Sequence, residues 1–362
     1  MSNNPNDKLR IGITIGDVSG IGPELVLKAF QDQRLKDQFI PILYGSSKVL
    51  NIYRKALEIN KFNYNIVQKA SQAHAGRLNL IEVGDDSDRF EIGKPSEAGA
   101  LIAYQALKSA IEDAQHQEID ALVTLPVDKS LIQQHHAGFT GHTEMLAEAF
   151  NVDDNLMLMV WDGLRVGLVT NHVPIQDVSR NISKERIIRK VMLLNESLQY
   201  DFNIPKPMIA VLGLNPHAGD NGLIGPEERE IIMPALEELS AKGIFVSGPY
   251  PADGFFGSMT YKRFDGVIAM YHDQGLTPFK LLAGYEGVNY TAGIPLVRTS
   301  PDHGVAFDIA GKNIADPASL YQSIFVAMDV FRNRTENAEL RANALVMGKN
   351  YVRERLDGDY EE

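Results

Sequence analysis

The sequence predicts an α/β fold in which two lobes share one continuous sheet. Short apolar runs alternate with amphipathic stretches along the chain, which is the pattern of strands and helices in α/β proteins. The chain has 362 residues, which is long for one hydrophobic core and favours two domains or one large α/β unit. No linker rich in Pro, Gly or Ser divides it, so two lobes joined by a common sheet fit better than two separate domains.

The individual elements follow from the apolar patterns and from capping residues. Ser96 is predicted to cap a helix, because its hydroxyl can accept a hydrogen bond from a free first-turn amide. Pro23 and Pro226 each fall at the first position of a helix, where a missing N–H costs nothing. From Asn333 onward the chain is predicted to form one charged helix with a frayed end. The strand candidates are 11–15, 39–44, 78–83, 121–125, 165–170, 207–214 and 266–271. The helix candidates are 23–33, 96–114, 142–150, 183–198 and 226–242.

The composition excludes several classes of protein. A net charge of −12 without a Lys/Arg cluster argues against nucleic-acid binding, since phosphate neutralisation needs a basic surface. The absence of cysteine excludes disulfides, thiolate nucleophiles and cysteine metal ligands, and it fits a reducing compartment. The polar start MSNNPNDKLR is not a signal peptide, and no apolar run approaches the roughly 20 residues of a membrane helix. We therefore expect a cytoplasmic protein that binds neither nucleic acid nor membrane.

Three histidines occupy the same position relative to a predicted strand. His172, His217 and His272 each follow an apolar run and precede a turn that contains Pro or Gly. Ligands in open α/β sheets bind beyond the carboxyl ends of strands. Three imidazoles with an open coordination position are typical of a catalytic divalent metal site. The alternative is that each histidine is a loop residue bonded to the backbone, and the pattern alone leaves both interpretations open.

Two other segments combine turns with polar residues. In FTGHTE the first-turn amides of a helix, with the side chains of His142 and Thr143, could bind an anion. Alternatively, Thr143 or the glycine turn only caps that helix. GDVSGIGPE (16–24) permits a tight turn, yet it matches neither G-x-G-x-x-G nor a P-loop, so a structural turn is predicted. His135 and His136 are assigned to the surface.

The region after YHDQG supplies positive charge and backbone-rich loops. Lys280, Asn289 and Arg298 lie there, and such cations can hold phosphate or carboxylate, although each alone is more often a surface residue. Segment 302–317 is dense in Gly, Asp and Asn, as ligand-binding loops often are.

Seven motifs together resemble the 4-hydroxythreonine-4-phosphate dehydrogenase family. They span residues 14–313, nearly the whole chain, in the order of the family. The stretch HGVAFDIAGKNIADP also resembles the cofactor loop of isopropylmalate and isocitrate dehydrogenases. The resemblance implies a two-lobed, three-layer α/β/α fold of that type with a mixed central sheet, not a Rossmann fold. It implies a discontinuous lobe, 10–125 plus 281–362, with the cofactor loop, and a lobe 126–280 with metal and substrate ligands. The motifs are TIGDVSGIGPE, TLPVDK, FTGHTE, TNHVP, NPHAGDNGLIGPEE, YHDQGLTPFK and TSPDHGVAFDIAGKN.

The resemblance also implies roles for individual residues. One divalent ion (zinc, magnesium, manganese or cobalt) is expected per active site, with one ligand from the partner subunit of a homodimer. Asp128 stands at a position that varies in the family, so nothing follows from it. The implied metal ligands are His172, His217 and His272, and catalytic roles fall to these three, Lys280 and Asp253. The implied substrate contacts are His142, Thr143, Lys280, Asn289 and Arg298. The implied contacts to NAD or NADP are His303, Gly304, Asp308, Gly311 and Asn313.

The reaction implied by the resemblance is oxidation of 4-phosphooxy-threonine by NAD or NADP. The β-keto acid then loses carbon dioxide to give an aminoacetone phosphate for pyridoxal phosphate synthesis. Relatives with the same motifs oxidise erythronate or threonate 4-phosphate or cyclic dihydrodiols, which is the first alternative. A three-histidine metal hydrolase without nucleotide and a non-catalytic anion-binding protein are alternatives from other classes. Neither of these two explains the whole set of motifs.

Overall fold

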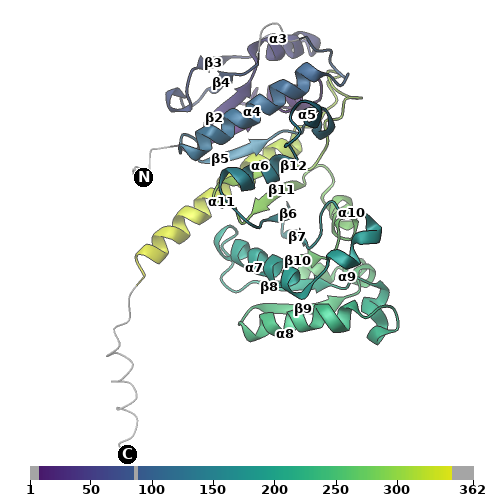
Figure 1. Cartoon of the computed structure of the whole chain (residues 1–362). Coiled ribbons are helices and arrows are strands. Elements are labelled where there is room, and N and C mark those ends of the chain that lie inside the picture. Colours follow the sequence, from purple (N-terminus) through teal and green to yellow (C-terminus); the bar gives the residue numbers. More distant parts are fainter. Residues whose placement is uncertain (1–7, 85–88, 345–362) are drawn as a thin grey trace, which may run out of the picture.

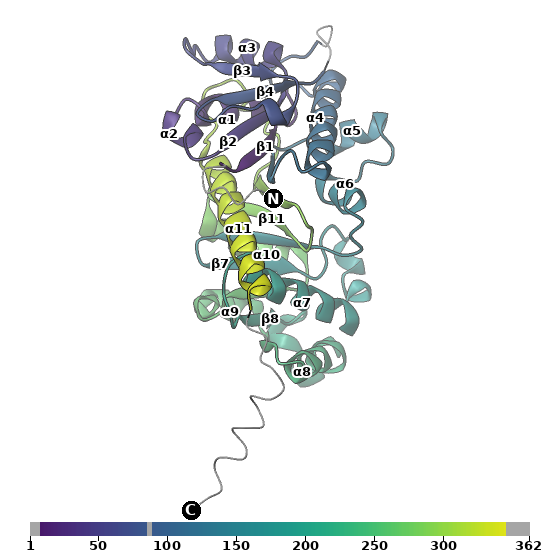
Figure 2. The same ribbon diagram turned by 90° about the vertical axis from the view of Figure 1, so that its left-hand side faces the viewer.

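The computed structural model describes residues 8–84 and 89–344, which form one sheet of 12 strands with helices on both faces (Figures 1 and 2). The strand order is β3-β4-β2-β1-β5-β12-β11-β6-β7-β10-β8-β9. Neighbours are parallel except at β12–β11, β11–β6 and β6–β7. This mixed sheet lacks the 3-2-1-4-5-6 order of a Rossmann fold, as predicted. The strands are β1 (Arg10–Thr14), β2 (Ile40–Gly45), β3 (Tyr64–Val67), β4 (Leu78–Glu82), β5 (Ala121–Thr124), β6 (Leu156–Trp161), β7 (Leu164–Leu168), β8 (Met208–Leu212), β9 (Phe245–Tyr250), β10 (Gly266–Ala269), β11 (Val288–Ala292) and β12 (Val297–Pro301).

Helices cover the two faces and complete the predicted three layers. Helices α1 and α7 both pack against α11 on one side of the sheet, and Figure 2 shows α4, α5 and α6 on the other. Strands β1, β5 and β10 are buried almost throughout, as expected of parallel strands covered on both faces. The helices are α1 (Gly22–Ala29), α2 (Gln33–Lys36), α3 (Ser47–Ala56), α4 (Glu97–Gln115), α5 (Lys129–His135), α6 (His142–Ala149), α7 (Lys184–Tyr200), α8 (Met233–Ala241), α9 (Ala252–Gly257), α10 (His272–Ala283) and α11 (Ala318–Ala342).

All seven predicted strands are present, but β3, β6, β9, β11 and β12 were not predicted. Strands β11 and β12 were missed because polar residues interrupt their apolar pattern. Asn289 and Thr291 alternate with buried Tyr290 on β11, and Arg298 lies on β12. These strands resemble loops in the sequence because the polar side chains of Asn289 and Arg298 face a cavity.

The predicted helices are also present, but several bounds differ. The helix predicted from Asn333 onward begins at Ala318, and the helix predicted at 23–33 ends at Ala29. Ser96 caps α4 as expected, accepting a hydrogen bond from Gly99 N at 3.1 Å. The predicted helix 226–242 is a π-helical turn, Glu228–Ile232, followed by α8. The turn predicted at YHDQG is wrong, since His272 begins helix α10. Gly275 makes this possible, because a Cβ there would meet the side chains of the sheet at 2.9–3.0 Å.

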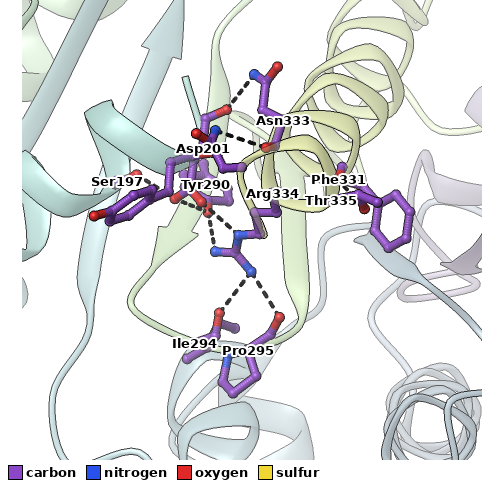
Figure 3. A network of polar contacts seen from close by, with 11 residues as sticks. Ser197, Asp201, Tyr290, Ile294, Pro295, Phe331, Asn333, Arg334 and Thr335 are labelled. Carbon is purple, nitrogen blue, oxygen red and sulfur yellow. Dashed lines mark hydrogen bonds and ion pairs between the residues drawn. The ribbon is translucent and has the colours of Figure 1, made fainter. Parts of the chain in front are cut away.

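The long helix α11 is anchored by a buried polar network (Figure 3). Arg334 donates from Nε to Asp201 Oδ1 at 2.6 Å and from Nη2 to the Tyr290 hydroxyl oxygen at 2.7 Å. Tyr290 and Ser197 in turn donate to Asp201 Oδ2, both at 2.6 Å. The network ties α11 to the end of α7 and to β11, so it fixes which face of β11 presents Asn289.

Part of what the sequence predicted for the C-terminal end cannot be compared with the structure. The frayed end lies outside the described residues, as does the part of the first lobe beyond 344. Within the described part of the chain, no helix is long and apolar enough to cross a membrane.

Candidate active site

A cavity of about 310 Å³ lies where β5, β11 and β12 meet α6, α10 and the loop after β7. Eight of the sequence-predicted site residues line it: His142, Thr143, His172, Lys280, Asn289, Arg298, His303 and Gly304. A cavity of about 410 Å³ between α7 and α11 contains none of them, and its Arg334 and Asp201 already pair with each other. The smaller cavity is therefore the candidate active site.

Arg298 gives this cavity a positive charge that forms no ion pair within the described part of the chain. The side chain is 4% exposed and donates from Nε and Nη2 to Thr124 Oγ1 at 3.0 and 2.6 Å. Its Nη1 donates to Thr291 Oγ1 at 3.2 Å. Among the described residues no carboxylate lies within ion-pair distance of it. Burial lowers the pKa of Arg298 to about 10, although the negative charge of Glu144 on the cavity wall opposes this shift. A buried cation held only by hydroxyl groups is costly until an anion binds beside it.

Helix α6 adds neutral and dipolar groups to the same wall. It begins after Gly141, whose φ is +152°, and no side chain caps it, so its first-turn amides have no side-chain partner. The part of the alternative in which Thr143 is the cap is therefore wrong. His142 is 9% exposed, and its Nε2 has no hydrogen-bond partner among the described residues. Burial, then Arg298 and Lys129, hold the pKa of His142 well below its ordinary value, so the imidazole is neutral.

Lys280 is the second predicted cation, and its charge is paired. Its Nζ lies 3.0 Å from Asp302 Oδ1, with the Lys280 side chain 49% and the Asp302 side chain 13% exposed. Burial raises the pKa of Asp302, which the charge of Lys280 opposes. The pair is suited to holding or passing a proton, whereas Arg298 is suited to fixing an anion.

Two of the three histidines line a neighbouring cavity of about 430 Å³, which shares Asn171 and His172 with the candidate active site. His172 follows β7 and His272 follows its parallel neighbour β10, and their ring centroids are 5.8 Å apart. His272 Nδ1 donates to Asp273 Oδ1 at 2.7 Å, which leaves Nε2 free to ligate. Partial burial, then Lys129 and His272, lower the pKa of His172, which favours the neutral form that binds metal. The donor type and the neutral state of His172 therefore fit a divalent ion.

His217 does not join this pair within one chain. Among residues 8–84 and 89–344, no three His, Asp or Glu side chains form a group that could hold a metal ion. The exposed His217 opens a left-handed run through Asn221 with φ between 42° and 77°, which costs roughly 1–2 kcal/mol per non-glycine residue. Buried Glu228 stabilises the turn by accepting from Leu214 N and Asn215 N at 2.8 and 2.7 Å. Asp253, exposed on α9, also lies away from the cavity.

The predicted cofactor residues lie along one loop, 303–317, at the edge of the cavity. His303 and Gly304 line the cavity, while Asp308, Gly311 and Asn313 follow in the same loop but do not line it. His303 Nε2 is buried without a partner among the described residues, and a Cβ on Gly304 would meet nothing within 4 Å. Open backbone beside an unpaired ring nitrogen fits a nucleotide cofactor.

Twelve lining residues were not predicted, and five of them bear on the chemistry and lie in quoted motifs. Asn171 has a buried Oδ1 without a partner in the described part of the chain, and Asp302 pairs with Lys280. The signal that could have found them is adjacency to assigned residues, as for Asn171 before His172. The other three are Thr124, Lys129 and Glu144. Of the two histidines assigned to the surface, His135 is exposed but His136 stacks on Tyr104, with ring centroids 3.9 Å apart.

Comparison with known proteins identifies the family. Residues 37–327 match the family described as "Pyridoxal phosphate biosynthetic protein PdxA". A Bacteroides thetaiotaomicron protein named 4-hydroxythreonine-4-phosphate dehydrogenase is 49% identical over 354 residues, which cover 98% of this chain and 96% of that protein. The chain belongs to the PdxA family. The resemblance inferred from the seven motifs is thereby confirmed.

Solved structures agree with membership of the PdxA family. A 4-hydroxythreonine-4-phosphate dehydrogenase from Klebsiella pneumoniae matches with a TM-score of 0.77 at 33% identity, covering 91% of this chain and 99% of that chain. A terephthalate 1,2-cis-dihydrodiol dehydrogenase from Burkholderia xenovorans LB400 matches with a TM-score of 0.59 at 27% identity, covering 89% and 98%. The two-lobed scaffold is thus shared by enzymes named for different substrates.

Proposed function

We propose that this chain oxidises 4-phosphooxy-threonine (4-hydroxythreonine 4-phosphate) with NAD or NADP. The β-keto acid formed loses carbon dioxide to give 3-amino-2-oxopropyl phosphate, in pyridoxal 5'-phosphate biosynthesis. Support comes from the relative of that name at 49% identity. The observation that carries the proposal is buried Arg298, which forms no ion pair among the described residues and lies in the same cavity as Lys280, His172 and His303.

The substrate's anionic groups would bind at the Arg298 wall. Arg298 would contact an anion with the guanidinium edge that the two threonine hydroxyls leave free, and neutral His142 would donate or accept without adding charge. Thr143 and Asn289 would complete the shell from α6 and β11. Lys280, held by Asp302 at 3.0 Å, would receive or return the proton that leaves the substrate's hydroxyl group.

The cofactor and the metal supply the chemistry that side chains lack. When bound, the divalent ion polarises the alcohol oxygen and the nicotinamide accepts the hydride. His172 and His272 of one copy would hold the ion, and His217 of a second copy would complete its ligands in a homodimer. Helix α9, which carries Asp253, packs against the turn of His217, so both residues would reach the site together from that second copy.

The two lobes would then divide at the centre of the sheet. The first seven strands in the sheet order, β3 to β11, come from 10–125 and 281–362, and the last five, β6 to β9, come from 126–280. This order supports the proposed boundaries. The candidate active site lies where the two groups of strands meet, so residues of both lobes would contact one substrate.

A substrate panel with nicotinamide reduction as the readout tests the function. The panel comprises 4-phosphooxy-threonine, erythronate 4-phosphate, threonate 4-phosphate and a cyclic dihydrodiol. We expect the highest kcat/KM with 4-phosphooxy-threonine. Glu144 lines the cavity without an ion pair among the described residues, and it would attract the ammonium group that the other three compounds lack. A higher kcat/KM with another compound would refute the substrate, and no nicotinamide reduction with any would favour the hydrolase or binding-protein alternatives.

A further inference from the structure

A fully buried glutamate of the GDVSGIGPE motif accepts hydrogen bonds from the backbone of loop 303–317, the predicted cofactor loop. Glu24 is 0% exposed, and its carboxylate accepts from Gly311 N at 2.9 Å and from Ala315 N at 3.1 Å. Lys28, one helical turn later, pairs with Glu24 Oε1 at 2.9 Å and donates to the Ala315 carbonyl oxygen at 2.7 Å. One ion pair on α1 thus closes the far end of the loop through three contacts to its backbone.

The turn before α1, residues 16–21, contacts the start of the same loop. Ile21 N donates to the Val305 carbonyl oxygen at 3.0 Å. Gly20 lies so close that a Cβ there would come within 2.6 Å of that oxygen and 2.2 Å of the Val305 side chain. On its other side the turn is fixed to the wall of the cavity, because Asp17 N donates to the Pro126 carbonyl oxygen at 3.0 Å.

The loop has a conformation that needs such support. Ala306, Gly311 and Asn313 all have left-handed backbone, with φ of 49°, 71° and 62°. Left-handed conformations at residues other than glycine cost on the order of 1–3 kcal/mol each and persist only where the surroundings hold them. The contacts of Glu24 and Lys28 hold positions 311 and 315 on either side of Asn313, and the hydrogen bond from Ile21 N holds Val305 next to Ala306.

We propose that GDVSGIGPE is the template that holds loop 303–317 in its cofactor-binding shape, with Glu24 as the central positioning residue. This role does not need the spacing of a phosphate-binding loop, which the motif lacks. The motif would shape a second segment, and that segment would bind the nucleotide. The inference rests on the proposed function, in which this loop binds NAD or NADP. It assigns a role to the motif that sequence analysis left as a structural turn.

The variants are Glu24→Gln, which replaces one acceptor oxygen by a donor group, and Lys28→Met, which removes the ion pair and keeps the carboxylate. Glu112→Gln is the matched control, since Glu112 also pairs with a lysine four residues away but is 57% exposed. Lys28→Met decides the outcome if Glu24→Gln does not fold. The full-length dimer with a divalent ion is used throughout.

Two measurements separate positioning from general stability. Hydrogen exchange of the cofactor-free protein should be at least about tenfold faster at Gly311 or Ala315 in Glu24→Gln, because one of the two amides loses its acceptor oxygen. In Lys28→Met exchange at Ala315 should also be faster, because the carboxylate loses its ion pair and the Ala315 carbonyl oxygen loses its donor. Titration calorimetry with NAD⁺ and NADP⁺ should give affinity for the preferred cofactor weakened about 10- to 150-fold, the range for a lost charge-assisted hydrogen bond. At saturating cofactor, kcat and the KM of the phosphorylated substrate should stay within about threefold, less than 1 kcal/mol by the affinity scale.

The outcomes distinguish this inference from the proposed function. Unchanged loop exchange, or equal weakening of cofactor and substrate, overturns the positioning role alone. A lower Tm with unchanged cofactor affinity does the same. A wild-type protein that binds neither NAD⁺ nor NADP⁺ overturns the proposed function and this inference together. Glu112→Gln should match the wild type in all measurements.

Discussion

Arg298 is the residue whose replacement tests the binding site most sharply. Its guanidinium is buried and donates to two threonine hydroxyls, with no carboxylate partner among the described residues. The variants are Arg298→Ala, Arg298→Lys and Arg298→Met. Arg189→Ala is the control, because Arg189 is 57% exposed and pairs with Asp154 at the surface.

The magnitude follows from the contact that is lost. A charge-assisted hydrogen bond is worth about 1.5–3 kcal/mol, so substrate affinity should fall about 10- to 150-fold in Arg298→Ala. Arg298→Lys should lose most of the substrate affinity as well. An ammonium group lacks the planar fork of the guanidinium, so it cannot bond both hydroxyls and an anion at once. Lowering of the pKa from its ordinary value to about 10 means that burial destabilises the charged side chain by on the order of 3 kcal/mol relative to the unfolded chain. The Tm of ligand-free Arg298→Met should therefore not fall.

Calorimetric titration with 4-phosphooxy-threonine and, separately, with the nicotinamide cofactor measures both affinities. We expect a large loss for the substrate and a change below about twofold, or 0.4 kcal/mol, for the cofactor. An Arg298→Ala protein that keeps substrate affinity and loses cofactor affinity would place Arg298 on the cofactor side and refute the reasoning.

Three further predictions concern the metal, pH and stability. His272→Ala should keep its fold and lose bound metal and turnover, and full metal occupancy by elemental analysis would contradict the ligand role. Burial raises the pKa of Asp17 from 3.8 to about 6, so the folded protein keeps a proton that the unfolded chain releases, and stability falls as pH rises from about 4 through 6. Asp17→Asn should gain on the order of 3 kcal/mol over the wild type between pH 4 and 8, and parallel denaturation profiles would count against this. Arg334→Met should lose about 3–5 kcal/mol of unfolding free energy, because it leaves Asp201 buried without its cation, and a loss below about 1 kcal/mol would show that the network in Figure 3 is not needed for stability.

The elements that could be predicted from the sequence are those whose environment is uniform. Strands β1, β5 and β10 are covered on both faces, so they appear as continuous apolar runs. Strand β12 has one face in the cavity, and Arg298 on that face breaks the pattern that would have identified it. Helix α10 was predicted as a turn because Gly275 and Pro278 resemble loop residues, although Gly275 is required by close packing on the sheet.

The candidate site was predicted in part for similar reasons. The strand-end positions of His172 and His272 can be read from the chain, and the parallel pairing of β7 and β10 brings them together. The displacement of His217 depends on a left-handed turn, which residue types do not reveal. The Lys280–Asp302 pair joins α10 to the end of β12, so it became visible only with the fold.

The central claim is that one complete metal site takes His172 and His272 from one copy and His217 from another. Mixing His217→Ala with His272→Ala protein under conditions of proven subunit exchange tests it most directly. Random exchange makes half of the dimers mixed, each with one intact site, so about a quarter of wild-type activity should return, with metal restored in the same proportion. Mixed dimers that regain neither activity nor bound metal would contradict a shared site.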